Sequence, residues 1–115
     1  MTTHDSTVFE LRTYTTYEGK LPELLARFRD HVAKLFEKHG MTNIAYWVPQ
    51  DAPASQNTLI YVLAHPSREA AKKNWDTFLK DAEWQKVLNE SEANGKLALK
   101  IESVFMNPAE FSPMK

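Results

Sequence analysis

The sequence predicts a single domain of the α+β class, and three observations lead to this prediction. The chain has 115 residues, of which 43% are hydrophobic and 25% charged, and these values are typical of one globular domain with its own core. Four segments are rich in β-forming residues. Two of the intervals between them carry apolar residues at helical spacing. We therefore expect one domain over residues 8–113, preceded by a disordered polar terminus at 1–7.

The first strand and the first helix occupy the N-terminal third of the chain. The segment VFELRTYT at 8–15 predicts the strand. Pro22 suits the first turn of the helix, where its missing N–H has no intrahelical partner, and Gly40 can supply the left-handed residue that follows the last turn. The apolar residues between them form one helical stripe: Leu21, Leu24, Leu25, Phe28, Val32, Leu35 and Phe36.

A hairpin with a long connection follows this helix. Residues 41–48 predict the second strand, which ends before Pro49, and residues 58–64 predict the third. The polar residues 49–57 form the loop between them.

The second helical region leads into the last strand. We expect Ser67 to cap its N-terminus and Asp81 to interrupt or recap it. Gly95 ends the region, and residues 96–106 predict the fourth strand, followed by a tail in which Phe111 is the one expected anchor. Two apolar stripes are predicted to face the core: Ala71, Trp75, Phe78 and Leu79, and then Trp84, Val87 and Leu88.

The resulting order is β-α-β-β-α-β. With right-handed crossovers, this order gives a four-stranded antiparallel sheet with both helical regions on one face, which is a ferredoxin-like fold. In the first strand Phe9 and Leu11 alternate with Glu10, Arg12 and Tyr14, and we expect the apolar pair to lie beneath the helices. The second and third strands are apolar on both faces, so we expect a second copy of the sheet to cover the other face and form a dimeric barrel.

Four charged residues lie on the two strands that this fold makes neighbours: Glu10, Arg12, Lys100 and Glu102. In one interpretation, Glu10 pairs with Lys100 and Arg12 with Glu102 at the dimer interface, which would fix the register without necessarily adding stability. The alternative is a polar pocket floor in which Arg12 binds an anionic group.

Composition disfavours several classes of function. The chain has no cysteine, which removes disulfides, cysteine-ligated metal clusters and cysteine nucleophiles. The net charge is −1 without a basic cluster, so nucleic acid is not an expected partner, and the longest apolar run is too short to span a membrane. The three glycines form no phosphate-binding loop or nucleophile elbow. We therefore expect a soluble, cytoplasmic protein.

The histidines do not have the spacing of a metal site. His31 and His39 share the first predicted helix but are separated by about 12 Å along its axis, which is too far for both to bind one ion. No metal and no cofactor are therefore predicted, although the spacing is compatible with a single axial histidine to a haem.

Five segments of the chain match a known family in order: FELRTYT at 9–15, GKLPELLARFRDH at 19–31, LFEKHGMTNIAYW at 35–47, LIYVLAHPSREAAKKNWDTFLKDAEWQKV at 59–87 and IESVFMNPAEFSP at 101–113. On these segments the sequence resembles the NIPSNAP family of the dimeric α+β barrel superfamily, and it looks like the compact single-domain bacterial members. The resemblance implies a homodimer with a pocket between the sheet and the helices. The superfamily includes cofactor-free monooxygenases, haem-degrading enzymes, small lyases or isomerases, and members without known catalysis.

Three hypotheses of function remain open. The first is a pocket for a small, mostly apolar or amphipathic ligand, with or without cofactor-free catalysis. Its candidate catalytic residues are His65, His31 and Arg12, and its candidate ligand-binding residues are Arg12, Tyr14, His31, Tyr46, Tyr61, His65 and Trp75. The second is a non-catalytic interaction module in which an exposed Trp84 or Trp47 meets a partner. The third is a haem- or flavin-associated monooxygenase.

His65 has two interpretations in this scheme. Pro66 favours an extended conformation at His65 and prepares Ser67 as a cap, so the histidine can mark a transition from strand to helix with its imidazole bonded to nearby backbone. Alternatively, the imidazole lies at the mouth of the pocket and acts as a general acid or base near neutral pH.

Overall fold

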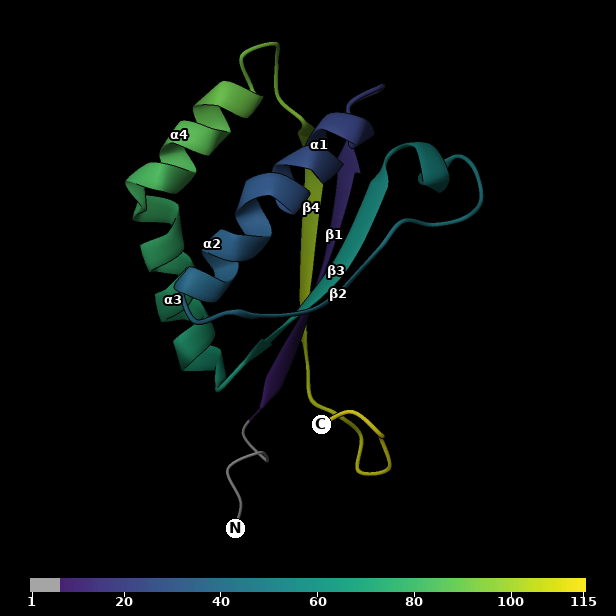
Figure 1. The fold of residues 1–115 in the computed structure, drawn as a ribbon. Coiled ribbons are helices and arrows are strands. Elements are labelled where there is room, and N and C mark those ends of the chain that lie inside the picture. Colours follow the sequence, from purple (N-terminus) through teal and green to yellow (C-terminus); the bar gives the residue numbers. More distant parts are fainter. Residues whose placement is uncertain (1–6) are drawn as a thin grey trace.

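The computed structural model describes residues 7–115, and the expected N-terminal tail, apart from Thr7, lies outside this range. The elements, in chain order and as labelled in Figure 1, are β1 (Val8–Thr16), α1 (Leu21–Arg27), η2 (Phe28–Val32), α2 (Ala33–Lys38), β2 (Thr42–Trp47), η3 (Ala54–Gln56), β3 (Thr58–His65), α3 (Arg68–Lys80), α4 (Ala82–Ser91) and β4 (Ala98–Met106). This order confirms the predicted arrangement, with the second helical region divided in two.

The four strands form one antiparallel sheet in the order β2-β3-β1-β4. β1 and β3 lie at the centre, and β2 and β4 form the edges. The first and last strands of the chain are therefore neighbours, as the predicted ferredoxin-like fold requires.

The first helical segment comprises α1, η2 and α2, and it is not uniform. In η2, a π-helix, the N–H of Ala33 donates to the carbonyl of Phe28, five residues earlier. The sequence pattern predicts a single helix here, and the structure adds this widened turn within it. Arg27, Phe28 and Val32 at the turn are all buried. A π turn inside a helix is found frequently at functional sites.

The second helical layer is divided at Asp81. Ser67 caps α3 as predicted, because its hydroxyl accepts a hydrogen bond of 3.0 Å from the first turn. Asp81 ends α3 and caps α4, where its carboxylate accepts from the N–H of Glu83 at 2.8 Å. Lys38 and His39, at the end of the first helical segment, also bond to this carboxylate. Asp81 therefore ties the two helical layers together.

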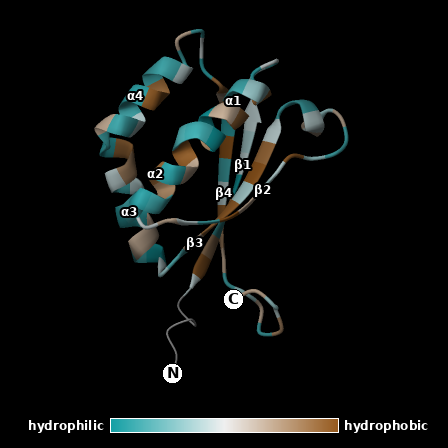
Figure 2. Cartoon of the chain, viewed as in Figure 1, coloured by the Kyte–Doolittle hydropathy of each residue, from teal (hydrophilic) through white to brown (hydrophobic). Residues whose placement is uncertain are grey.

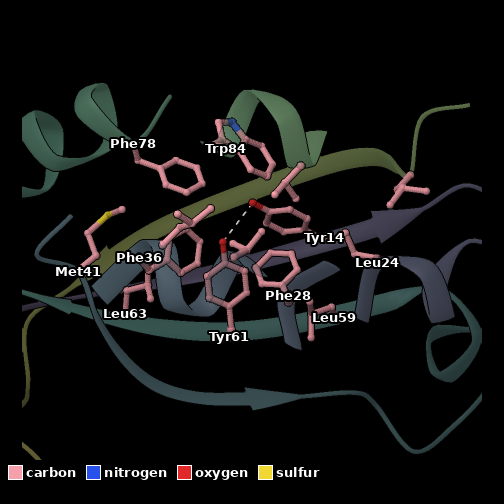
Figure 3. Packing of buried hydrophobic residues seen from close by; sticks show 14 of the residues in the cluster. Tyr14, Leu24, Phe28, Phe36, Met41, Leu59, Tyr61, Leu63, Phe78 and Trp84 are labelled. Atoms are coloured by element: carbon pink, nitrogen blue, oxygen red, sulfur yellow. Dashed lines mark hydrogen bonds between the residues drawn. The ribbon is translucent and has the colours of Figure 1, made fainter. Parts of the chain in front are cut away.

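The helices pack on one face of the sheet, and the core lies between the two layers (Figure 1). Figure 3 shows how aromatic rings from both layers meet there. The aromatic members of the core are Tyr14, Phe28, Phe36, Tyr61, Phe78 and Trp84. The ring centroids of Phe36 and Phe78 are 5.2 Å apart, a distance typical of aromatic pairs.

The face of β1 that lies beneath the helices is opposite to the predicted one. Tyr14 belongs to the core, and Glu10 on the same face is 1% exposed. Phe9 and Leu11 alternate with them and lie on the opposite face, outside the core cluster. Hydrophobic alternation did not identify the buried face because both faces of this sheet carry apolar residues.

No helix within residues 7–115 covers the opposite face of the sheet, which we call the open face. The strand register places on it Phe9, Leu11, Ala45, Trp47, Ile60, Val62 and Val104. Trp47 is 52% exposed and Val104 54%, whereas Phe9 and Val62 are buried among their neighbours. Figure 2 shows hydrophobic residues along the strands and mainly hydrophilic ones along the outer sides of the helices. Uncovered apolar sheet faces are uncommon in monomeric proteins.

The C-terminal tail follows β4 without regular secondary structure. Phe111 is 90% exposed, so the predicted anchor does not form. Among the helices of residues 7–115, none has the length and apolar character needed to cross a membrane.

Candidate functional site

A buried carboxylate lies at the centre of the candidate site. Glu10, on β1, is 1% exposed and accepts hydrogen bonds at both oxygens. Its Oε1 accepts from His65 Nε2 at 2.9 Å and from Trp75 Nε1 at 2.8 Å. Its Oε2 accepts from Arg12 Nη1 at 2.9 Å and from Ser103 Oγ at 2.7 Å. This one carboxylate therefore joins β1, β3, β4 and α3.

Arg12 is held by several neighbours at once. Its Nη1 bonds to Glu10, its Nε donates to the hydroxyl of Tyr61 at 3.0 Å, and its Nη2 donates to that of Tyr14 at 3.3 Å. The guanidinium lies over the ring of Trp75, with 4.2 Å between Cζ and the ring centroid. A planar guanidinium with these partners is fixed in orientation, and Glu10 compensates its charge.

Tyr14, Tyr46 and Tyr61 lie on the face of the sheet beneath the helices. The hydroxyls of Tyr14 and Tyr61 point toward one another in Figure 3, and that of Tyr61 donates to that of Tyr14 at 3.1 Å. Tyr46 stacks on Tyr61 with ring centroids 5.0 Å apart, and its hydroxyl bonds to Asn43. The tyrosines thus contact one another in a row, and two of them, Tyr14 and Tyr61, bond to Arg12.

Burial and hydrogen bonding shift the pKa values of these groups in different directions. Burial by itself would raise the pKa of Glu10, but the hydrogen bonds from His65 and its other three donors outweigh burial and lower the pKa from 4.5 to about 2. Burial raises the pKa of Tyr61 well above its ordinary value. Burial opposes the charge on Arg12, yet its interactions with Tyr14 and Tyr61 raise its pKa. At neutral pH the site holds one carboxylate, one guanidinium and a neutral Tyr61.

A cavity of about 440 Å³ lies between this part of the sheet and the helices, which we call the helix–sheet cavity. Its aromatic lining consists of Tyr14, Phe28, Phe36, Trp75, Phe78 and Trp84. Its charged lining consists of Arg12, Arg27, Glu92 and Lys96. A mostly apolar space with a few polar groups is typical of sites for small molecules.

The structure places the predicted ligand-binding residues at different depths. Arg12, Tyr14 and Trp75 line the helix–sheet cavity. Tyr61 lies directly behind them, bonded to both Arg12 and Tyr14. Tyr46 lines a separate hollow against the first helical segment. The predicted set is therefore brought together only in part.

Neither histidine proposed as an acid or base lines the helix–sheet cavity. His65 is 1% exposed and lies behind Glu10, to which its Nε2 donates, so the prediction that it stands at the mouth of the pocket is wrong. It does mark the end of β3, but its partner is a carboxylate rather than backbone. His31 is exposed and lines a groove between α1 and α4, apart from Arg12.

The predicted ion pairs of Glu10 with Lys100 and of Arg12 with Glu102 do not form. Lys100 and Glu102 fall on the open face, whereas Glu10 and Arg12 lie beneath the helices. Glu10 pairs with Arg12 at 2.9 Å, and Lys100 lies 3.6 Å from Glu102. From Phe9 to Thr15, even-numbered residues of β1 stand opposite odd-numbered residues of β4, so a pairing one residue out of register exchanges the faces. The pocket-floor alternative therefore fits Glu10 and Arg12 alone.

The two tryptophans expected at a partner surface differ in exposure. Trp84 is 9% exposed and stacks on Phe78 with ring centroids 4.9 Å apart, so its predicted exposure is wrong. Trp47 is exposed, on the open face of the sheet.

The sequence pattern does not single out Arg27 and Ser103, which both belong to the site. Arg27 stands three residues after Leu24 on the buried side of the first helical segment, and a charged residue in such a stripe is a signal of a buried polar site. Ser103 carries no comparable signal, because its face depends on the register of β4.

The arrangement offers hydrogen-bond donors to a ligand rather than a general base. Glu10 is occupied by four donors and has a low pKa, and His65 does not line the helix–sheet cavity. Arg12 and Tyr14 line it, and both can donate to an oxygen atom of a bound molecule. Within residues 7–115, no three His, Cys, Asp or Glu residues are grouped so that they could hold a metal ion.

These features define a class: a ferredoxin-like α+β domain with helices on one face of its sheet, a helix–sheet cavity lined mainly by aromatic residues, and an apolar face left open. The family model NIPSNAP matches residues 9–113, and the chain belongs to the NIPSNAP family. None of the curated proteins matches the chain.

Solved structures share this fold. A NIPSNAP family protein with unknown function from Agrobacterium tumefaciens has a TM-score of 0.82 at 22% identity, over 97% of this chain and 96% of that one. An uncharacterized NIPSNAP-like domain protein from Burkholderia xenovorans has a TM-score of 0.81 at 18% identity, over 96% and 91%. SnoaB, a cofactor-independent oxygenase from Streptomyces nogalater, has a TM-score of 0.62 at 12% identity, over 94% and 98%. The fold implied by the sequence resemblance is thereby confirmed.

Proposed function

We propose that this protein binds a small, mostly apolar ligand in the helix–sheet cavity and that it works as a homodimer. The observation that carries the proposal is the cavity, with a volume of about 440 Å³ and a mainly aromatic lining. Cavities of this size and composition suit small organic molecules. Arg12 and Tyr14 add the few donors that orient a ligand within such a space.

The polar part of this site is organised before any ligand arrives. Three nitrogen atoms of Arg12 have hydrogen-bond partners, and its guanidinium is stacked on Trp75. Trp75 is fixed in turn by its bond to Glu10. A site whose side chains are already ordered loses little conformational entropy when it binds, which favours affinity.

The homodimer is supported by the open face. Central strands β1 and β3 present one face that carries the partly exposed Leu11 and Ile60 and lacks a covering helix within residues 7–115. Burial of such an apolar surface against an identical one is favourable, at roughly 25 cal/mol per Å². A self-complementary contact of this kind gives a closed dimer.

The ligand proposal is tested by a fragment screen observed in NMR spectra of the indole N–H groups. Trp75 and Trp84 line the helix–sheet cavity, whereas Trp47 lies on the open face and serves as an internal control. We expect aromatic fragments to shift the signals of Trp75 and Trp84 and to leave that of Trp47 unchanged. Fragments that shift none of the three signals, or only that of Trp47, would remove the basis of the proposal.

A cavity-filling variant makes this test sharper. Ile101 lines the cavity from β4 and is 50% exposed, so Ile101→Trp should occupy part of the space without disturbing the buried core. We expect the variant to lose fragment binding. Asn89→Trp adds the same indole at an exposed position of α4 outside the cavity lining and should bind like the wild type.

Cofactor-free conversion of the bound ligand is a second candidate function. It is favoured by Arg12 and Tyr14, whose donors could stabilise negative charge that develops on a ligand oxygen. SnoaB, with the same fold, is a cofactor-independent oxygenase, so this fold accommodates such chemistry. We expect bound fragments to support oxygen uptake by the wild type that Tyr14→Phe reduces. Unchanged fragments and no oxygen uptake would leave binding as the function.

A further inference from the structure

We infer that the helix–sheet cavity is selective for an amphipathic monoanion, whose charged group is held by Arg27 and Lys96 while its apolar body lies among the aromatic rings. This inference rests on the proposed ligand-binding function and adds the chemical class of the ligand.

The charges of the cavity lining are not balanced. Arg12 is compensated by Glu10, 2.9 Å away, so this pair adds no net charge to the cavity. The remaining charged residues of the lining are Arg27 and Glu92, which form an ion pair at 3.4 Å, and Lys96. Lys96 makes no ion pair with the part of the chain that the structure describes. The lining therefore carries one more positive than negative charge, which favours an anion.

Arg27 is the more informative of these two cations because it is buried. The residue is 7% exposed, yet its hydrogen bonds are long: Nη1 donates to Ser91 at 3.3 Å and to Glu92 at 3.4 Å. Its Nε is buried without a hydrogen-bond partner in residues 7–115. Buried polar groups are nearly always satisfied in folded proteins, and an orphaned one calls for a partner. Nε itself is too buried to be reached from the cavity, so an anionic group there would bond to the terminal nitrogen atoms of this guanidinium, which is well suited to carboxylate-like groups.

The surroundings of Arg27 provide the place for an apolar body. The π turn positions Arg27 beside Phe28 and Val32, which line the same cavity. Its Cζ lies 5.3 Å from the centroid of the Trp84 ring, which is also part of the lining. An anion bound at Arg27 therefore has aromatic surface in immediate reach. In this inference Arg27 and Lys96, rather than Arg12, hold the anionic group.

Two probes with the same rings test this selectivity. The anion 8-anilino-1-naphthalenesulfonate and the neutral N-phenyl-1-naphthylamine share an apolar body and differ in the sulfonate, and both fluoresce more strongly in apolar sites. We expect the wild type to bind the anion at least ten-fold more tightly, because a hydrogen bond to a charged group contributes a factor of this order. This preference should decrease as the salt concentration rises.

Variants locate the charged contact. Arg27→Gln and Lys96→Gln should each reduce affinity for the anionic probe several-fold and leave affinity for the neutral probe unchanged. Lys96 is exposed, so its variant keeps the test valid if the buried Arg27 variant does not fold. Lys86→Gln removes an exposed charge of α4 outside the cavity lining and should bind both probes like the wild type. Ile101→Trp should reduce the binding of both.

The outcomes separate this inference from the function on which it rests. One outcome would overturn the anion selectivity and leave the ligand site intact: the wild type binds both probes with equal affinity, and Ile101→Trp weakens the binding of both. A preference for the anion that survives in both Arg27→Gln and Lys96→Gln would also overturn it. If neither probe binds, the ligand site and the inference both fail.

Discussion

The carboxylate of Glu10 accepts four hydrogen bonds, from donors on β1, β3, β4 and α3. Two of these donors, Arg12 and Trp75, line the helix–sheet cavity, so the position of Glu10 determines their position. Removing a charge from water is unfavourable unless the charge is paired and hydrogen-bonded, and Glu10 meets both conditions. We therefore regard Glu10 as a positioning residue rather than a catalytic one.

The low pKa of Glu10 predicts how stability depends on pH. The unfolded chain binds a proton at this group near pH 4.5, whereas the folded chain keeps it ionised down to about pH 2. The stabilisation is therefore present above pH 4.5 and is lost as pH falls from 4.5 toward 2. The displacement of the pKa from 4.5 to about 2 corresponds to about 3 kcal/mol. Urea unfolding at several pH values should show this loss in the wild type and a smaller one in Glu10→Gln.

A second prediction at this scale concerns Arg12. Arg12→Lys keeps the charge but removes the planar group that bonds to Tyr14 and Tyr61 and stacks on Trp75. We expect a loss of about 3 kcal/mol in the free energy of unfolding, since a buried network is left with unmet partners. Arg29→Lys, in an exposed pair, is the matched control and should change little. Equal stability of the two variants would show that the Arg12 network is not structurally important.

At the scale of elements, the order of strands and helices could be predicted because each has a local signal. Ser67 is followed by a helical stripe, and Asp81 both ends α3 and starts α4, which is the behaviour expected of short polar side chains at helix ends. The π turn at Phe28 could not be predicted, because the apolar spacing of the stripe continues through it.

The faces of the strands were harder to predict than the strands themselves. Alternation in β1 separates Phe9 and Leu11 from Glu10 and Arg12 but does not say which set is buried by helices. The usual preference for apolar residues gives the wrong answer, because Glu10 and Arg12 neutralise one another in the buried layer. The apolar set lies on the open face, where we propose a second copy. The sequence therefore showed an unusual group of charged residues on the first and last strands. It did not show the register between these strands, which decides the face on which each charge lies.

One element boundary can be tested with two glycines of positive φ. Gly40, at the end of the first helical segment, has φ +81°, and an added Cβ would lie 3.0 Å from the Asn74 side chain of α3. Gly19 has φ +76° and open space around it. Gly19→Ala should cost about 1 kcal/mol from backbone strain alone, and Gly40→Ala should cost more because the Asn74 side chain must also move by a few tenths of an ångström. A smaller cost at Gly40, measured by thermal or urea unfolding, would contradict this packing.

At the scale of the whole molecule, the sheet separates two surfaces with different proposed roles. The face beneath the helices carries the buried polar network and the helix–sheet cavity. The open face carries apolar side chains together with the exposed, oppositely charged Lys100 and Glu102. A sheet that is apolar on both faces needs a cover on each, and the helices supply only one.

The division predicts that a charge on the open face weakens self-association. Val104 is 54% exposed in the single chain, so Val104→Glu should fold normally. Burying the new carboxylate in an apolar contact is unfavourable, and we expect the dimer to dissociate at least ten-fold more readily. Asn89→Glu places the same charge on the outer side of α4 and should leave association unchanged. Size-exclusion chromatography over a range of concentrations measures both.

Sedimentation velocity of the wild-type chain at micromolar concentration shows whether a second copy covers the open face. We expect one species of twice the chain mass of 13.2 kDa. A single folded species of 13.2 kDa over the same concentrations would contradict it, because the open face would then be stable in water without a partner.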